Sequence, residues 1–381
     1  MKIKYYLYLL LKTNLLYQLF NVFFNLYIRK SIKHIFIFPF FQTGGGERVH
    51  LDIVKLFPSK TSLTIFTNNS ENKHFKKDFE KSCYIFEYNF LNEKLQKFFI
   101  NMICRFLNIQ KRKLTVFGCN NKVFYNILPL VENPNIFRVD LLHAFTKPGV
   151  GAEDTSLPYI QYLDRRVVIN KKTRCDFQSQ YSRNNIPDHY LKRIVQIQNA
   201  VKMPIKFKRN SNPKLHVCFV GRNSPEKRQH LFFDIAEELN ERFKFYSAGS
   251  DFANNFVENV GVLETQEELS SFYRSMDILL ITSSREGFPM VIMEAMAFGV
   301  VCITTNVGGI NEHLKNGLNG LLIENSVVER EIVDDFIKQL YTLSNDRELL
   351  KQISTNSFKY AYENFNEKKF RESYLELLSH A

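Results

Sequence analysis

The order of apolar runs and turns constrains this chain more than any other feature of its sequence. A short apolar run, a glycine-containing turn and a helical segment recur through residues 34–200, and the same order begins again at Lys214. Strands that alternate with helices form right-handed βαβ units around a parallel sheet. The sequence therefore predicts an α/β protein with two doubly wound, Rossmann-like domains that face each other across a cleft.

The expected strands are the apolar runs between these turns. In the first half they are His34–Phe41, Ser62–Thr67, Cys83–Tyr88, Leu114–Phe117, Phe137–Leu142 and Arg166–Asn170, and the segment Arg193–Gln198 ends this half. In the second half they are Lys214–Val220, Phe243–Ala248, Ile278–Thr282 and Val300–Thr304, with helices near Arg228–Leu239, Pro289–Phe298 and Val328–Leu343. Ligands of doubly wound sheets bind beyond the carboxyl ends of the strands, so turns at those ends are candidate binding sites.

The length of 381 residues favours two domains. We expect an amphipathic helix over residues 1–33, a first domain over 34–200 and a second over 214–360. Residues 201–213 are polar and basic and contain two prolines, which is typical of a linker. Residues 361–381 are expected to form a C-terminal helix that packs back on the first domain.

The first 33 residues are rich in apolar side chains and raise the question of a membrane span. Sixteen residues separate Lys12 from Arg29, fewer than the roughly 20 that cross a bilayer. The polar residues recur every three or four positions and form one stripe of a helix: Asn14, Gln18, Asn21, Asn25 and Arg29. Such a helix can lie in the headgroup plane of a membrane or pack on the protein's own first domain, and the sequence leaves both interpretations open.

Charge and cysteine content limit the partners and the compartment. Residues 1–200 hold 30 Lys and Arg against 14 Asp and Glu, a net of +16, whereas residues 201–381 hold 21 against 25, a net of −4. A basic domain can meet nucleic acid, an anionic membrane or an acidic small molecule. The six cysteines are scattered without metal-ligand spacing, so we expect neither a zinc site nor a disulfide framework, and a reducing cytoplasm is the simplest location.

Two motifs at strand ends suit phosphate. The run Gly44-Gly45-Gly46 follows the first strand and opens a helix, where backbone N–H groups can approach an anion. The second motif, residues 221–227, sets Arg222 and Lys227 five positions apart on a tight turn. A guanidinium fork beside a mobile ammonium matches a diphosphate, although either motif alone is also common as a structural or solvated turn.

Two further motifs follow strands of the second half. Glu286 precedes Gly287, Phe288 and Pro289, and Glu294 comes eight residues after Glu286. Because proline suits the start of a helix, Glu286 is expected in front of that helix and Glu294 within it. The last motif, Val307-Gly308-Gly309-Ile310-Asn311-Glu312 with residues 316–322, is predicted to be a glycine turn, a short helix and a second turn into a strand.

Together these motifs resemble a known family. The runs GGGERV, GR-x3-EK, EGFP-x4-E and VGGINE-x4-NG-x2-GLL occur in the order and at the separations found in retaining glycosyltransferases of family four, the glycosyl transferases group 1, which have the GT-B fold. The resemblance is closest over residues 214–325. Before residue 200 it depends on GGGERV, His143 and the segment 197–201.

The resemblance implies roles for individual residues. Arg222 and Lys227 would neutralise the donor diphosphate in place of a metal, which agrees with the absence of a DxD sequence. Glu294 would hold the ribose hydroxyls and Glu286 would contact the donor sugar at the reacting face. The remaining implied contacts are those of Gly287, Phe288 and Pro289 with sugar hydroxyls, of Gly45 and Gly46 with the phosphates, and, less specifically, of His143 with the donor sugar.

The expected activity is transfer of a sugar, with retained anomeric configuration, from a UDP- or GDP-linked donor to a lipid-linked or surface glycan of lipopolysaccharide or capsule biosynthesis. Cations at the leaving group stabilise the charge that develops as the anomeric bond breaks. The basic first half favours peripheral contact with an anionic inner membrane surface. Alternatives are a non-catalytic nucleotide-sugar-binding protein, a basic nucleic-acid-binding protein, and a nicotinamide oxidoreductase, the last disfavoured because the GxGxxG spacing is missing.

Overall fold

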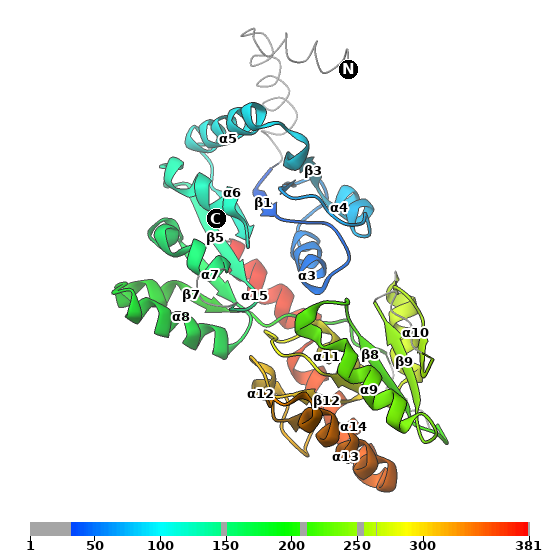
Figure 1. Ribbon diagram of the computed structural model, residues 1–381. Coiled ribbons are helices and arrows are strands. Elements are labelled where there is room, and N and C mark those ends of the chain that lie inside the picture. Colours follow the sequence, from blue (N-terminus) through cyan, green and yellow to red (C-terminus); the bar gives the residue numbers. More distant parts are fainter. Residues whose placement is uncertain (1–31, 146–150, 206–211, 250–254, 264, 380–381) are drawn as a thin grey trace. The chain divides into compact units, whose positions relative to one another are not determined.

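The computed structural model describes residues 32–145, 151–205, 212–249, 255–263 and 265–379 (Figure 1). The chain divides into two compact units. One unit comprises Met1–Asp140, Tyr159–Asp164 and Leu378–Ala381, and the other comprises Leu141–Pro158 and Arg165–Leu377. The amphipathic helix expected over residues 1–33 lies outside the described residues, except for its last two positions.

The first sheet has seven strands in the order β3-β2-β1-β4-β5-β6-β7. Its strands are β1 (His34–Phe38), β2 (Ser62–Phe66), β3 (Tyr84–Glu87), β4 (Leu114–Cys119), β5 (Ile136–Leu142), β6 (Arg165–Val168) and β7 (Ile194–Gln196). β1 pairs in parallel with both β2 and β4, which places it inside the sheet. All five residues of β1 are buried, as expected of a strand covered on both faces.

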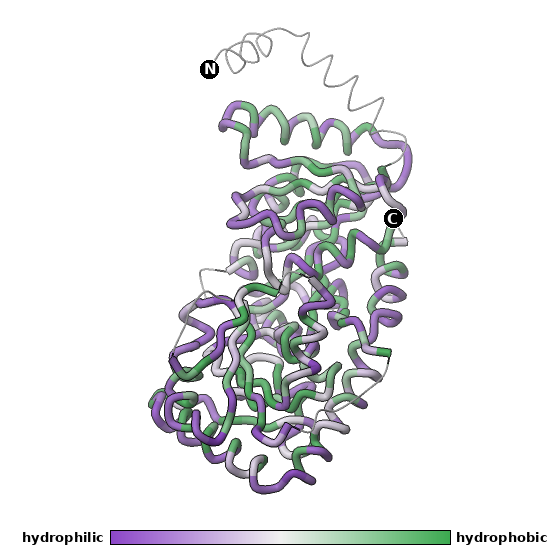
Figure 2. The backbone as a smooth tube through the Cα atoms, turned by 90° about the vertical axis from the view of Figure 1, so that its right-hand side faces the viewer, coloured by the Kyte–Doolittle hydropathy of each residue, from purple (hydrophilic) through white to green (hydrophobic). Residues whose placement is uncertain are grey.

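Helices connect these strands. They are α3 (Gly45–Val54), α4 (Lys76–Ser82), α5 (Glu93–Asn108), α6 (Lys122–Ile127), α7 (Ala152–Thr155) and α8 (Lys171–Arg183), with the 3-10 turns η2 (Tyr88–Phe90), η3 (Leu128–Leu130), η4 (Leu157–Tyr162) and η5 (Asp188–Arg193). Asparagine side chains cap the first turns of α5, α6 and α8 by accepting backbone N–H bonds. Figure 2 shows green and purple alternating along α5, because one face of this helix packs on the core.

The second sheet has six strands in the order β10-β9-β8-β11-β12-β13. They are β8 (His216–Val220), β9 (Lys244–Ala248), β10 (Val257–Asn259), β11 (Ile278–Ile281), β12 (Val301–Thr305) and β13 (Leu321–Ile323). The helical elements are η6 (Pro225–Lys227), α9 (Gln229–Leu239), α10 (Gln266–Ser275), α11 (Met290–Ala297), α12 (Ile310–His313), α13 (Glu329–Asn345), α14 (Arg347–Asn364) and α15 (Glu367–Ser379). Every strand pair in this sheet is parallel.

Apolar side chains of the central strands and of α9, α13 and α14 form the core of the second sheet. All four residues of β11 are buried, and the same is true of all five residues of β12. Strands covered on both faces have continuous apolar sequences, which is why these runs could be identified from the sequence. This core fixes the strand ends from which the candidate site projects.

The expected strands all occur within a few residues of their predicted bounds. β10 was not predicted, because it has three residues, two of them polar, and lies at the edge of the sheet. α9 begins at Gln229 and not at Arg228, whose backbone is left-handed with φ 45°. Among the residues that the structure describes, no helix has the length and apolar character needed to cross a membrane.

A matched pair of leucines tests the core of the second sheet. Leu340 of α13 is fully buried, whereas Leu318, in the turn before β13, is 54% exposed. We expect Leu340→Ala to lower the free energy of unfolding by about 2–5 kcal/mol, because the cavity it leaves adds to the lost burial. Leu318→Ala should change it by less than about 1 kcal/mol. Urea unfolding of both variants measures the difference, and equal losses would contradict this core assignment.

Candidate active site

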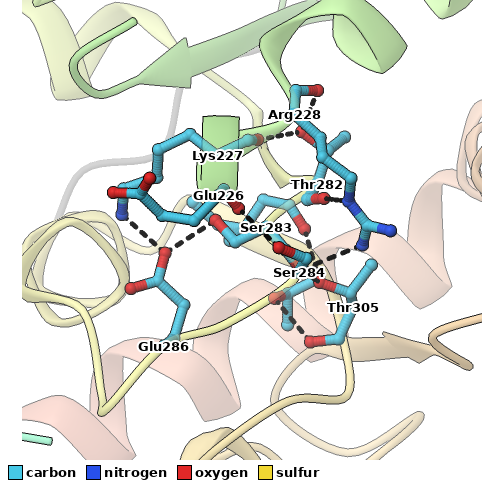
Figure 3. A network of polar contacts seen from close by, with 10 residues as sticks. Glu226, Lys227, Arg228, Thr282, Ser283, Ser284, Glu286 and Thr305 are labelled. Carbon is cyan, nitrogen blue, oxygen red and sulfur yellow. Dashed lines mark hydrogen bonds and ion pairs between the residues drawn. The ribbon is translucent and has the colours of Figure 1, made fainter. Parts of the chain in front are cut away.

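The site begins where β8 and β11 end side by side. These strands pair in parallel, with Ile278 opposite Val217 and Leu279 opposite Cys218. The loop after β8 forms the 3-10 turn η6, and the loop after β11 comprises residues 282–289. Because carboxyl ends of parallel neighbours meet at one edge of a sheet, the two loops lie against each other (Figure 3).

Polar contacts join the two loops. The Ser284 N–H donates to the carbonyl of Glu226 at 2.8 Å. The Thr282 hydroxyl lies 2.9 Å from the carbonyl oxygen of Lys227 and 3.0 Å from that of Arg228. A third strand end takes part, because the hydroxyl of Thr305 at the end of β12 donates to the carbonyl of Ser283 at 2.5 Å. The turn that contains Lys227 is therefore tied to the loop that contains Glu286.

The loops after β8 and β11 form a junction where they meet. Lys227 and Glu286 form an ion pair at this junction. The Lys227 Nζ lies 2.5 Å from Glu286 Oε1, and the side chains are 20% and 10% exposed. The Ser283 hydroxyl donates to the same oxygen at 2.6 Å (Figure 3). The structure thus brings together two predicted site residues that are 59 positions apart, as a pair of opposite charges largely shielded from water.

The glycine turn after β12 packs on the backbone of Glu286 and Gly287. Gly308 has φ +60°, and a Cβ added there would lie 1.7 Å from the Glu286 carbonyl oxygen. The Gly309 N–H donates to the Gly287 carbonyl at 2.8 Å. A Cβ on Gly287 would in turn lie 2.4 Å from the carbonyl oxygen of His143. Side chains cannot enter these contacts, so glycine is required here for close packing.

Phe288, Pro289 and Glu294 are placed by α11. Pro289 is the N-cap residue of this helix, so Glu286 precedes the helix and Glu294 lies inside it, as expected. Phe288 is 3% exposed and packs on the ring of His313, 4.5 Å away between centroids. The Tyr273 hydroxyl donates to Glu294 Oε2 at 3.3 Å, and burial raises the pKa of Tyr273 well above its ordinary value. Tyr273 therefore stays a hydrogen-bond donor to this carboxylate.

Arg222 and His143 have different surroundings. Arg222 is exposed on the loop after β8. Partial burial acts to raise the pKa of Glu226, but hydrogen bonds from its own backbone and from Ser224, together with the charges of Lys227 and Arg222, lower it overall. Burial lowers the pKa of His143 to about 4, so its imidazole is neutral at pH 7. The structure therefore places Arg222 on the same loop as Lys227, and the backbone of His143 next to Gly287.

Gly45 and Gly46 lie in the first turn of α3, in the other unit. The first backbone hydrogen bond of the helix runs from the Arg48 N–H to the Gly44 carbonyl at 3.0 Å. The N–H groups of Gly45 and Gly46 precede that bond and have no partner within the helix. Their position is the one that phosphate binding at a helix N-terminus requires.

Several residues of the junction were not identified from the sequence. They are Arg228, Thr282, Ser283, Thr305 and Asn325. The hydroxyl residues directly after the apolar runs of β11 and β12 were a usable signal, because short polar side chains at strand ends often join neighbouring loops. Arg228 gave no such signal, since a sequence does not show that a basic residue beside Lys227 is buried.

Comparisons with known proteins show similarity to glycosyltransferases. Residues 214–346 match the family described as glycosyl transferases group 1. An uncharacterized glycosyltransferase of Methanocaldococcus jannaschii is 29% identical over 249 residues, which span 57% of this chain and 69% of that protein. The capsular polysaccharide biosynthesis glycosyltransferase CapM of Staphylococcus aureus is 27% identical over 172 residues, which span 42% of this chain and 44% of CapM.

A solved structure supports the fold over most of the chain. The crystal structure of Anabaena HepE in complex with UDP and glucose superposes with a TM-score of 0.73, covers 92% of this chain and 100% of that chain, and is 16% identical. The two parallel doubly wound sheets are thus those of the GT-B fold, as the sequence motifs predicted. Residues 214–346 thus match the glycosyl transferases group 1 family, and a longer part of the chain is similar to a glycosyltransferase.

Two glycines with positive φ test the packing on Glu286. Gly308 and Gly317 have φ +60° and +75°, but a Cβ on Gly317 would meet nothing within 4 Å. Each change to alanine should lower the free energy of unfolding by about 1–2 kcal/mol, because alanine is strained at positive φ. Gly308→Ala should cost at least about 1–3 kcal/mol more, because the Glu286 backbone must move. Urea unfolding measures both, and equal losses would show that the Gly308 contact tolerates a side chain.

His313 gives the site a pH dependence of stability. Burial lowers the pKa of His313 to about 4 from the ordinary 6.5. As the pH falls from 7 to 5, the unfolded chain binds a proton that the folded protein does not, so the folded state loses stability. His313→Phe keeps a ring against Phe288 and should remove about 1–2 kcal/mol of this loss. Urea unfolding at pH 7 and pH 5 measures it, and an unchanged pH dependence would exclude His313 as its source.

Proposed function

We propose that this protein is a retaining glycosyltransferase that moves a sugar from a UDP- or GDP-linked donor to a lipid-linked or surface glycan, as in lipopolysaccharide or capsule biosynthesis. The observation that carries the proposal is the ion pair of Lys227 and Glu286 at the carboxyl ends of β8 and β11. HepE, which shares the fold, was crystallised with UDP and glucose, and CapM acts in capsular polysaccharide biosynthesis.

Lys227 and Arg222 neutralise the donor diphosphate in this proposal. Both side chains project from the loop between β8 and α9, so one ammonium and one guanidinium can face the same anion. Their charges stabilise the leaving nucleoside diphosphate as the anomeric C–O bond breaks. The two cations take the place of a metal ion. The N-terminus of α3, which Gly45 and Gly46 open, suits an anion through its backbone N–H groups.

Glu286 and Glu294 hold the rest of the donor. Glu294 binds the ribose hydroxyls from within α11, beside Tyr273. Glu286 and the backbone of residues 287–289 contact the sugar, with His143 nearby as a neutral hydrogen-bonding group. Gly287 is packed directly on the His143 carbonyl, so these two elements of the proposed sugar site are in close contact.

The surroundings of Glu286 favour one of the two routes by which the anomeric configuration of the sugar can be retained. A glutamate nucleophile would attack the anomeric carbon, whereas in the other route the acceptor enters on the face that the diphosphate leaves. Glu286 Oε1 accepts hydrogen bonds from Lys227 and Ser283, both of which lower the nucleophilicity of that oxygen. We therefore propose that the acceptor enters on the leaving-group face and that Glu286 positions the sugar.

The acceptor is proposed to reach the enzyme at a membrane. The first 200 residues carry a net charge of +16, which attracts the anionic lipid of the inner membrane surface. The stripe of polar residues between Asn14 and Arg29 is compatible with a helix in the headgroup plane. We propose a cytoplasmic protein that associates peripherally with this surface, where lipid-linked acceptors are available.

Paired variants test the site. Lys227→Ala and Glu286→Ala should each lower turnover by about 10²–10³-fold, because each removes a group that acts on the reacting donor. Both variants should stay folded. Lys351→Ala and Glu348→Ala provide the matched control, since these residues form an exposed pair on α14 at 3.6 Å. A panel of UDP- and GDP-sugars, screened by thermal stabilisation and then by donor hydrolysis or transfer, supplies the assay.

Near-normal turnover in folded Lys227→Ala or Glu286→Ala would contradict the site assignment. If donors stabilise the wild-type protein but are neither hydrolysed nor transferred, the protein is a non-catalytic nucleotide-sugar-binding protein. Purified control variants should retain the wild-type rate within twofold, which excludes a general effect of removing charge.

A further inference from the structure

Arg228 directly follows Lys227 in the chain and is buried, and the mechanism above gives it no role. Its residue is 8% exposed, and its backbone is in the left-handed region with φ 45° and ψ 48°. This position lies between the end of η6 at Lys227 and the start of α9 at Gln229. A long cationic side chain at such a point, withdrawn from water, requires specific partners.

The guanidinium of Arg228 joins three loops. Its Nε donates to the Thr282 carbonyl at 2.7 Å, and its Nη2 donates to the Ser283 carbonyl at 3.1 Å (Figure 3). Nη2 also donates to Asn325 Oδ1 at 2.7 Å. Thr282 and Ser283 follow β11, and Asn325 follows β13. Arg228 therefore connects the turn of Lys227 with the loop of Glu286 and with the loop after β13.

These hydrogen bonds run to neutral oxygens in a fixed geometry. Two carbonyl oxygens on consecutive residues suit the planar fork of a guanidinium, which holds them at set positions. The Thr282 hydroxyl connects the same two loops in the opposite direction, because its single proton is shared between the Lys227 and Arg228 carbonyls. Ser283, whose carbonyl Arg228 holds, also donates to Glu286 through its hydroxyl.

We propose that Arg228 is a positioning residue for sugar transfer: it holds the turn of Lys227 against the loop of Glu286 without contacting the donor. The inference rests on the proposed function only where it concerns turnover. Its structural part, that the guanidinium holds Lys227 in place, applies to the free protein. The two parts are tested separately.

Chemical modification of Lys227 tests the structural part. Arg228→Gly removes the guanidinium, and glycine adopts the left-handed backbone without strain. The probe is acetylation by N-hydroxysuccinimidyl acetate, followed by mass spectrometry of the Lys227 peptide. Release of Lys227 from Glu286 should accelerate its acetylation several-fold in the folded variant. Asn325→Ala, which removes one of the three acceptors, should accelerate it less.

Arg242→Ala is the matched control. Arg242 is exposed and donates to Ser344 and Asn345 near the end of α13. Its loss therefore removes guanidinium hydrogen bonds elsewhere in the unit that contains the second sheet. It should leave acetylation of Lys227 at the wild-type rate. Unchanged acetylation in folded Arg228→Gly would overturn the proposal whether or not the protein transfers sugar.

A double-mutant cycle tests the catalytic part with the donor found in the panel. Arg228→Gly should lower kcat at least tenfold with a smaller change in KM, since a misplaced group weakens the chemical step. If Arg228 acts through Lys227, Arg228→Gly should add little to the loss already caused by Lys227→Ala. Additive losses would show that Arg228 does not act through Lys227. A wild-type protein without turnover would refute the proposed function and leave the acetylation result decisive for Arg228.

Discussion

The parallel pairing of β8 with β11 is the constraint on which the site depends. It brings two loops that are about 60 residues apart in the chain to the same edge of the sheet, so Lys227 can reach Glu286. Opposite charges that are mostly shielded from water attract each other more strongly than an exposed pair. The attraction persists only if both loops are held in place, and the polar contacts of Thr282 and Arg228 hold them.

Close packing and charge act together at this edge. Glycine at positions 287 and 308 lets backbone segments approach where a Cβ would overlap a carbonyl oxygen. The close approach leaves little room for water around the Glu286 carboxylate, which is 10% exposed in its side chain. A donor diphosphate that binds here must compete with Glu286 for the Lys227 ammonium. The same exchange of partners would release the carboxylate to contact the sugar.

The sequence predicts the strands well and the side-chain network poorly, for physical reasons. Buried parallel strands such as β11 and β12 have continuous apolar sequences that can be identified locally. β10 has no such signature, since three residues at a sheet edge carry little apolar surface. The family motifs implied different roles for Lys227 and Glu286, on the donor diphosphate and on the donor sugar, and predicted no direct contact between them. The burial of Arg228 depends on three loops meeting, which no local pattern indicates.

A crystal structure of the protein with UDP tests the central claim most directly. The account predicts that the diphosphate lies at the carboxyl ends of β8 and β11, within hydrogen-bond distance of the Lys227 Nζ, and that this nitrogen has moved away from Glu286. A nucleotide bound at another edge of the sheet, with the ion pair of Lys227 and Glu286 intact, would contradict it.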